Sequence, residues 1–184
     1  MNITVKVPAS SANLGPGFDA LGLALDLLNE TTVTLAMDFS VTIHGEGAEK
    51  ISRAKNNLIL RAAQKCAQRV GRSLLPFHAE CVNRIPMGSG LGSSAAAVLT
   101  GLLAANALMG SPLLKEEILS LASEMEEHPD NVAPALMGWL VVSTVDGDKI
   151  IARQLPIMPL EVTIVVPEFS LPTRKARAAL QEQV

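Results

Sequence analysis

The sequence contains no tyrosine, and aromatic residues of any kind make up only 3% of it. Proteins that bind single-stranded nucleic acids stack bases on aromatic side chains, so this mode of binding is not expected here. Basic residues do not gather either: the 15 Lys and Arg are scattered over 184 residues, and the net charge is −3. A duplex-binding surface needs a basic patch or stripe. We therefore expect no nucleic acid as a partner.

Long apolar runs are also missing. The longest, around residues 95–109, contains Thr100 and Asn106 and is too short to span a membrane. The first eight residues alternate apolar and polar and lack the apolar length of a signal peptide. We expect a soluble, cytoplasmic protein with no membrane partner, and the oligomeric state stays open, with a homodimer allowed.

Cysteine is scarce, with Cys66 in a helical pattern and Cys81 in a strand pattern. The two have neither CxxC spacing nor a neighbouring His cluster. Buried free thiols are therefore favoured over a disulfide or a metal site.

The residues that are present predict one domain of the α+β class. Hydrophobic residues reach 48% against 18% charged, so part of the apolar surface is expected to be covered by something else. Strands and helices alternate irregularly, as in an α+β fold. The expected strands are residues 3–7, 21–27, 31–37, 39–44, 77–85, 138–145, 149–154 and 162–166, with a loop over 8–19. The expected helices are 58–70, capped by Asn57 and closed by Gly71, then 93–109, 113–127 and a last one from about 173.

A glycine- and serine-rich loop is the strongest chemical signal. Residues 86–97 read P-M-G-S-G-L-G-S-S-A-A-A and lead from an expected strand into an apolar helix. Glycines let backbone N–H groups turn toward an anion, and the helix N-terminus adds positive potential, so we interpret the loop as a phosphate cradle. It lacks the lysine of a Walker loop, so the phosphate's cation must come from elsewhere.

The loop sequence also has three other possible interpretations. Gly90, Gly92 and Ala95 fit the dinucleotide fingerprint G-x-G-x-x-A, but the helix is followed by another helix instead of a parallel strand. Neither Ser89 nor Ser93 has a glycine two positions away on each side, as the G-x-S-x-G nucleophile elbow requires. A simple connecting turn remains the alternative, although three glycines in five residues exceed what a turn requires.

An acidic cluster near the end of an expected helix is the second chemical signal. Glu126, Glu127, His128, Asp130 and Asn131 follow a helix, where carboxylates can hold Mg²⁺ beside phosphate oxygens; a solvated helix end with a turn is the alternative. His128 is a poor metal ligand candidate, because no second His or Cys stands at ligand spacing.

Other polar residues suit a small ligand. Asn13 and Asp19 lie in a stiff Gly/Pro-rich loop that suits recognition of a small polar molecule, or simply forms a turn. The last expected helix begins with a basic cluster of Thr173, Arg174, Lys175 and Arg177. An Arg here suits the binding of a carboxylate, although such charges are more often simply solvent-exposed on a helix.

Together these residues resemble the GHMP kinases, and among them the homoserine kinases. P-x-x-x-G-L-G-S-S-A over 86–95 resembles the second signature of the superfamily. The stretch P-A-S-S-A-N-L-G-P-G-F-D over 8–19 resembles the first homoserine kinase signature, and Glu126 with H-P-D-N-V-A-P over 128–134 resembles the third conserved stretch. The run P-T-R-K-A-R over 172–177 matches as well.

The resemblance implies a fold like the second domain of ribosomal protein S5, a mixed β-sheet packed against helices. It implies ATP-dependent phosphorylation of the L-homoserine hydroxyl to O-phospho-L-homoserine, in threonine biosynthesis. Asn57 would border the adenine, Ser94 and Glu126 would hold Mg²⁺, and Asn13, Asp19, Asn131 and Arg177 would bind homoserine. The ATP phosphates would be wrapped by Pro86, Met87, Gly88, Ser89, Gly90, Leu91, Gly92, Ser93, Ser94, Ala95 and Ala96.

Two departures from the family pattern stand out. Glu127 occupies a position where the family usually has Gly. Family members are also longer, so residues 1–184 are expected to be the N-terminal ATP- and substrate-binding domain without the C-terminal GHMP domain, weakly active alone. The alternatives are another small-alcohol kinase of the superfamily and a non-catalytic, S5-like nucleic-acid-binding module.

Overall fold

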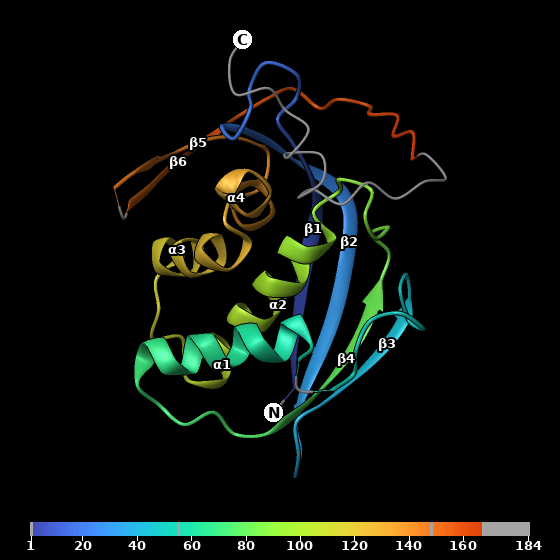
Figure 1. Ribbon diagram of the computed structural model, residues 1–184, viewed down its shortest axis with the longest axis vertical. Coiled ribbons are helices and arrows are strands. Elements are labelled where there is room, and N and C mark those ends of the chain that lie inside the picture. Colours follow the sequence, from blue (N-terminus) through green and yellow to red (C-terminus); the bar gives the residue numbers. More distant parts are fainter. Residues whose placement is uncertain (1, 55, 148, 167–184) are drawn as a thin grey trace.

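The computed structural model describes residues 2–54, 56–147 and 149–166. They form a mixed six-stranded sheet with the helices gathered on one face (Figure 1). This arrangement confirms the predicted α+β class. In chain order the elements are β1 (Asn2–Ala12), β2 (Leu21–Leu35), β3 (Ser40–Gly45), α1 (Leu58–Val70), β4 (Phe77–Asn83), α2 (Ser93–Leu108), α3 (Lys115–Glu126), α4 (Pro129–Met137), β5 (Leu140–Asp146) and β6 (Lys149–Leu155).

The long strand β2 organises the sheet. It pairs antiparallel with β1 over nearly its whole length, with β4 through residues 30–35 and with β5 through residues 21–23. The path of strands runs β3-β4-β2-β5-β6, and β3 and β4 are parallel, joined through α1. Two separate strands were expected at 21–27 and 31–37, which was wrong because polar Asn29 lies inside a continuous strand. Its side chain is buried and satisfied by the backbone of a neighbouring segment.

The first strand extends five residues further than expected. Residues 8–12 were predicted to be loop, but they pair with β2 as far as Ala12. The alternation that buries Val5, Val7 and Ala9 would place Ser10 on the opposite face. A register shift between Pro8 and Ser10 breaks this alternation, and Ser10 is fully buried as well.

Local capping signals placed the helix α1 correctly. Asn57 Oδ1 accepts a hydrogen bond from the Ile59 amide at 2.9 Å, and Gly71 closes the helix in the left-handed conformation, with φ at 68°. The helices expected at 93–109 and 113–127 correspond to α2 and α3.

The helix α4, over Pro129–Met137, was not expected. The sequence His128-Pro129 does end α3, as predicted, but Pro129 then occupies the first turn of α4. Proline is favoured there because its missing N–H would be unpaired in any case. The cluster around Asp130 and Asn131 therefore lies on a helix N-terminus, and the expectation of a loop was wrong.

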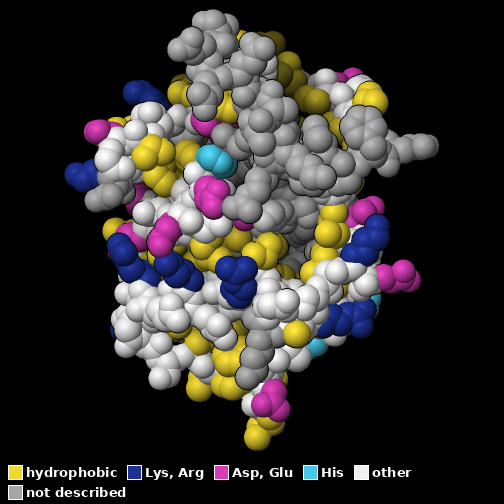
Figure 2. Space-filling view, viewed as in Figure 1, with side chains coloured by type: hydrophobic (Ala, Val, Ile, Leu, Met, Phe, Trp, Pro, Cys, Tyr) yellow, Lys and Arg dark blue, Asp and Glu magenta, His cyan; other side chains and the backbone are white. Residues whose placement is uncertain are grey.

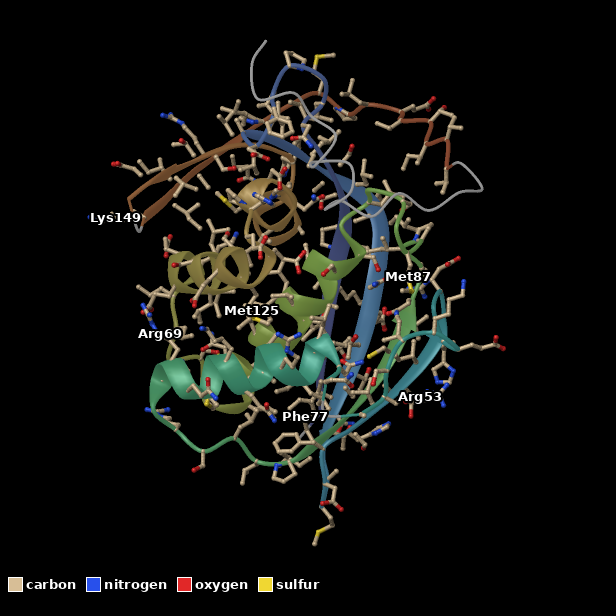
Figure 3. The ribbon with its side chains drawn as sticks, viewed as in Figure 1. Arg53, Arg69, Phe77, Met87, Met125 and Lys149 are labelled. Atoms are coloured by element: carbon tan, nitrogen blue, oxygen red, sulfur yellow. The ribbon has the colours of Figure 1, made fainter. Side chains whose placement is uncertain are left out.

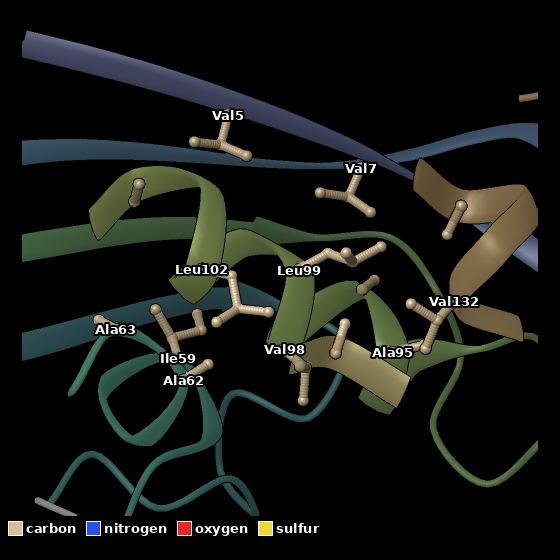
Figure 4. Close-up of a cluster of buried hydrophobic side chains, with 14 of the residues drawn as sticks. Val5, Val7, Ile59, Ala62, Ala63, Ala95, Val98, Leu99, Leu102 and Val132 are labelled. Atoms are coloured by element: carbon tan, nitrogen blue, oxygen red, sulfur yellow. The ribbon is translucent and has the colours of Figure 1, made fainter. Parts of the chain in front are cut away.

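The core lies between the sheet and α2, which is buried along most of its length as its apolar composition predicted. Figure 4 shows this helix packed by Val98, Leu99 and Leu102 against α1 and β1. Cys66 and Cys81 are free and buried. Burial raises the pKa of the Cys66 thiol to about 11 and also raises the pKa of the Cys81 thiol.

The remaining expectations concern the C-terminal part and the surface. Residues 162–166 do not form the expected strand, and the helix expected from 173 lies outside the described residues. None of the described helices is long and apolar enough to cross a membrane. On the face shown in Figure 2, Lys and Arg are interspersed with Asp and Glu. Exposed apolar side chains include Val145, Ile151, Met158 and Val165.

Candidate functional site

The glycine loop leads from β4 to the N-terminus of α2. Gly88, Gly90 and Gly92 all have positive φ, at 65°, 76° and 70°, a conformation that glycine adopts without steric cost. Ser89 Oγ donates to the Pro86 carbonyl at 2.8 Å and closes the turn. Gly92 is the N-cap of α2, so no side chain caps this helix. The first amides of α2 and its positive dipole end are therefore available to an anion.

Asn29 holds the entrance of the glycine loop, a role that the sequence analysis missed. Its Oδ1 accepts hydrogen bonds from the backbone amides of Arg84 at 2.7 Å and Ile85 at 3.1 Å. The β2–β4 ladder ends one residue away, at the Glu30–Val82 pair, so the Asn29 side chain takes over where backbone pairing stops. A polar residue interrupting an apolar strand pattern was the only sequence signal for it.

Ser94 and Glu126 meet, as a shared metal-binding role requires. Ser94 Oγ donates to Glu126 Oε1 at 2.6 Å, which joins the first turn of α2 to the end of α3. Burial, aided by the charges of Asp130 and Glu127, raises the pKa of Glu126, while the Ser94 hydrogen bond and His128 act in the lowering direction. Among the described residues no three His, Cys, Asp or Glu cluster as metal ligands. A cation at this pair would have to complete its shell with ligand or water oxygens.

The conformation of Glu127 explains why glycine suits this position. Glu127 is the C-cap of α3 and has a left-handed backbone, with φ at 69°. A residue with a Cβ pays about 1–2 kcal/mol there, and glycine does not. The departure from the family pattern thus places strain, as well as charge, beside Glu126.

The loop between β1 and β2 holds Asn13 and Asp19, both with left-handed backbones at φ 69° and 57°. Asn13 Oδ1 accepts from the Asp19 amide at 2.9 Å, and the Asn13 amide donates to the Leu21 carbonyl at 2.8 Å. The turn-forming role considered for Asn13 is therefore real. It fixes the Asn13 side chain and the Asp19 backbone on one compact loop.

Three segments converge at Gly92. The Ser10 amide donates to the Leu91 carbonyl at 3.1 Å, and Ser10 Oγ donates to Asn131 Oδ1 at 3.0 Å. A Cβ on Gly92 would collide with Ser10 Oγ and lie 3.1 Å from Asn131 Oδ1. A Cβ on Gly22, after the β1–β2 loop, would likewise collide with the Asp130 carbonyl oxygen. The glycine loop, β1 and α4 are thus in direct contact.

A mostly apolar cavity of about 200 Å³ adjoins the glycine loop. Asn57 lies in its wall; the side chain is 3% exposed, and its Nδ2 donates to the Ser52 carbonyl at 2.6 Å. Met87 extends from the exit of β4 and borders the cavity (Figure 3). The other lining residues are Asn29, Thr31, Ile43, Ile51, Leu58, Ile59, Cys81, Asn83, Gly88, Ser93, Ser94, Ala97 and Thr100.

The structure therefore brings most of the predicted site residues into one region. The glycine loop contacts the cavity, the Ser94–Glu126 pair and, through Ser10, Asn131. Asn13 and Asp19 follow Ser10 along the chain, in the loop after β1. Arg177 and the basic cluster at 173–177 lie outside the described residues.

Comparison with known proteins points to one family. The profile of the GHMP kinases N terminal domain matches residues 57–139. The chain is 47% identical over 183 residues to a homoserine kinase of Carboxydothermus hydrogenoformans, and 45% identical over 181 residues to one of Moorella thermoacetica. These matches cover 99% and 98% of the chain but only 60% and 61% of the relatives. The crystal structure of a homoserine kinase from Cytophaga hutchinsonii superposes with a TM-score of 0.80 at 28% identity, over all of this chain and 61% of that one.

Replacing Glu127 by glycine should stabilise the fold. Glu127→Gly removes the cost of a left-handed residue with a Cβ and should raise the free energy of unfolding by about 1 kcal/mol in urea titrations. Glu127→Ala is the matched control, because it removes the same charge and keeps the Cβ. Equal stability of the two variants would show that charge alone matters at this position.

The raised pKa of Glu126 predicts a pH dependence of stability. Between its unfolded and folded pKa the folded state binds more protons, so Glu126 lowers the free energy of unfolding as pH rises through that window. Glu126→Gln should therefore gain stability relative to wild type between about pH 4 and pH 7. Urea unfolding at the two pH values, with chelator present, measures this gain.

Glu116→Gln serves as the control for this measurement, because it removes an exposed carboxylate from the same helix. A Glu126→Gln variant that loses stability relative to wild type toward pH 7 would contradict the assigned direction of the shift.

Proposed function

We propose that residues 1–184 are the ATP- and substrate-binding domain of a homoserine kinase, because residues 57–139 match the GHMP kinases N terminal domain and nearly the whole chain is similar to homoserine kinases. The activity transfers the γ-phosphoryl group of ATP to the hydroxyl of L-homoserine, a step in threonine biosynthesis, in the cytoplasm. The observation that carries the proposal is the uncapped N-terminus of α2, preceded by three left-handed glycines and adjoining a cavity.

The cavity and the glycine loop would bind different parts of ATP. Whole ligand pockets usually measure about 300–1,000 Å³. At about 200 Å³ the cavity suits one part of the nucleotide, and its apolar walls suit the adenine. The phosphates then extend along the glycine loop to the first amides of α2, where backbone donors and the helix dipole favour negative charge. Asn57 borders the base and is rigid, because both Nδ2 and Oδ1 of its side chain are hydrogen-bonded to the backbone.

Ser94 and Glu126 would hold Mg²⁺. Their donor set fits this ion, which prefers oxygen and commonly takes one or two protein ligands plus phosphate oxygens and water. Bound there, the ion would neutralise charge on the transferring phosphoryl group, which the lysine-free loop does not do. Burial raises the pKa of Glu126, and a cation bound beside it would favour the charged form of this carboxyl.

Asn13, Asp19, Asn131 and Arg177 would bind homoserine, with Arg177 taking its carboxylate. In the transfer, the hydroxyl oxygen bonds to the γ-phosphorus, the bond to the β–γ bridging oxygen breaks, ADP leaves, and the hydroxyl proton passes to solvent. The transition state is loose, so positioning and charge neutralisation count more than a strong base. An amide at Asn131 meets that need, since it orients a hydroxyl without accepting its proton.

The direct test is an ADP-release assay coupled to L-homoserine. It uses the 184-residue chain and, alongside, the product of the uninterrupted reading frame that contains codon 184. We expect homoserine-dependent ADP release, weak from the 184-residue chain because closure over the substrates needs further structure. Turnover with another small alcohol but not with homoserine would replace homoserine as the proposed substrate. No turnover with any alcohol would overturn the proposal that the protein is a kinase.

A cavity-filling variant tests the place of the nucleotide. Ala97→Leu adds three carbons to the cavity wall and should weaken ATP binding about tenfold or more, as measured by calorimetry. Ala107→Leu is the matched control, since Ala107 is a partly exposed residue of the same helix outside the cavity lining. Equal ATP affinity of the two variants would contradict a nucleotide base in this cavity.

A further inference from the structure

The side chain of Ser10, on β1, bonds to Asn131 in the stretch H-P-D-N-V-A-P over 128–134. It is fully buried, although strand alternation would turn it away from the helices, because of the register shift after Pro8. Its backbone amide is bonded to the Leu91 carbonyl in the glycine loop. The position of Ser10 relative to the loop is therefore set by the backbone and does not depend on its own hydroxyl.

The hydroxyl makes a second, separate contact with Asn131. Oδ1 of an amide can only accept, so the Ser10 hydroxyl must donate its proton in the 3.0 Å bond between them. The backbone of Asn131 is held as well, because its main-chain N–H donates to Asp130 Oδ1 at 3.0 Å. With Oδ1 occupied, the amide cannot rotate freely about its last torsion.

The nitrogen of the Asn131 side chain, Nδ2, is left to serve as a hydrogen-bond donor. Asn131 is partly exposed, and within the described residues its Nδ2 makes no hydrogen bond. Nδ2 carries two donors and no acceptor. A group held in this way offers N–H to a ligand oxygen and offers no oxygen that could receive a proton.

Gly92 makes this arrangement possible. No side chain fits at Gly92, since a Cβ would enter the space that Ser10 Oγ and Asn131 Oδ1 share. The Ser10–Asn131 bond thus lies directly against the residue that begins the phosphate-facing helix. A shift of the Asn131 side-chain amide would therefore disturb the backbone within one residue of the proposed phosphate contacts.

We propose that Ser10 is a positioning residue: its hydroxyl holds Asn131 Oδ1 so that Nδ2 is the group directed to the phosphoryl-accepting hydroxyl of the substrate. The inference rests on the proposed function for the identity of the substrate, but not for the geometry. Asn131 then acts as a hydrogen-bond donor to the attacking oxygen, and Ser10 acts only through Asn131.

A double-mutant cycle on the complete reading-frame product tests the proposal. Ser10→Ala should lower kcat about tenfold, the effect of losing one hydrogen bond of this kind, with the KM for ATP unchanged. In an Asn131→Ala background, Ser10→Ala should have no further effect on kcat. Ser143→Ala is the matched control: Ser143 is also a buried strand serine, and its Oγ has no partner among the described residues. Multiplying effects of the two changes on kcat would overturn the proposal.

A readout without turnover separates this inference from the proposed function. In ¹⁵N-labelled protein, the Asn131 side-chain amide pair is identified by its loss in Asn131→Asp. Ser10→Ala should move that pair toward the shifts of an unbonded Asn and speed its hydrogen exchange, while Ser143→Ala should not. Unchanged Asn131 signals in Ser10→Ala would overturn the positioning role, whereas absent homoserine turnover in wild type would overturn only the proposed function.

Discussion

The left-handed turn at Gly92 is the constraint around which the site is built. It begins α2 without a side-chain cap, and it leaves only enough room for Ser10 and Asn131 to meet beside it. A larger residue would both strain the backbone and separate the two side chains. The same glycine therefore exposes the helix N-terminus to an anion and brings the first and third motifs within hydrogen-bonding distance. The proposed phosphate cradle and the residues proposed to face the substrate thus share one structural element.

The scaffold keeps this turn rigid from two directions. Behind it, α2 is buried on nearly all sides, packed against α1, β1 and the remaining helices, so its N-terminus cannot shift without disturbing the core (Figure 4). In front, Asn29 holds the backbone where β4 becomes the loop. Between these anchors the glycines provide the turns, while the ends of the loop stay in place. Such preorganisation would lower the entropic cost of binding the proposed triphosphate.

Sequence patterns predicted what depends on near neighbours. The bounds of α1 followed from the Asn57 cap and Gly71, and the burial of α2 followed from its composition. The sequence patterns failed where tertiary contacts override local preference. Pro8 and the polar residues after it suggested a loop, but pairing with β2 keeps them in strand. His128-Pro129 ended one helix as expected and also began another, because proline is tolerated in a first turn.

The sequence by itself determined which residues are proposed to carry the chemistry: the glycine loop, the acidic end of α3 and the polar loop after β1 are contiguous motifs, and their residue types are readable without a fold. Only the tertiary structure decided that they lie together in one region. The Ser10–Asn131 bond joins residues 121 positions apart, and the Asn29 bond to Arg84 joins residues 55 apart. Periodicity and capping report on neighbours within a turn or a strand, whereas these contacts depend on how β1, β2 and α4 pack together.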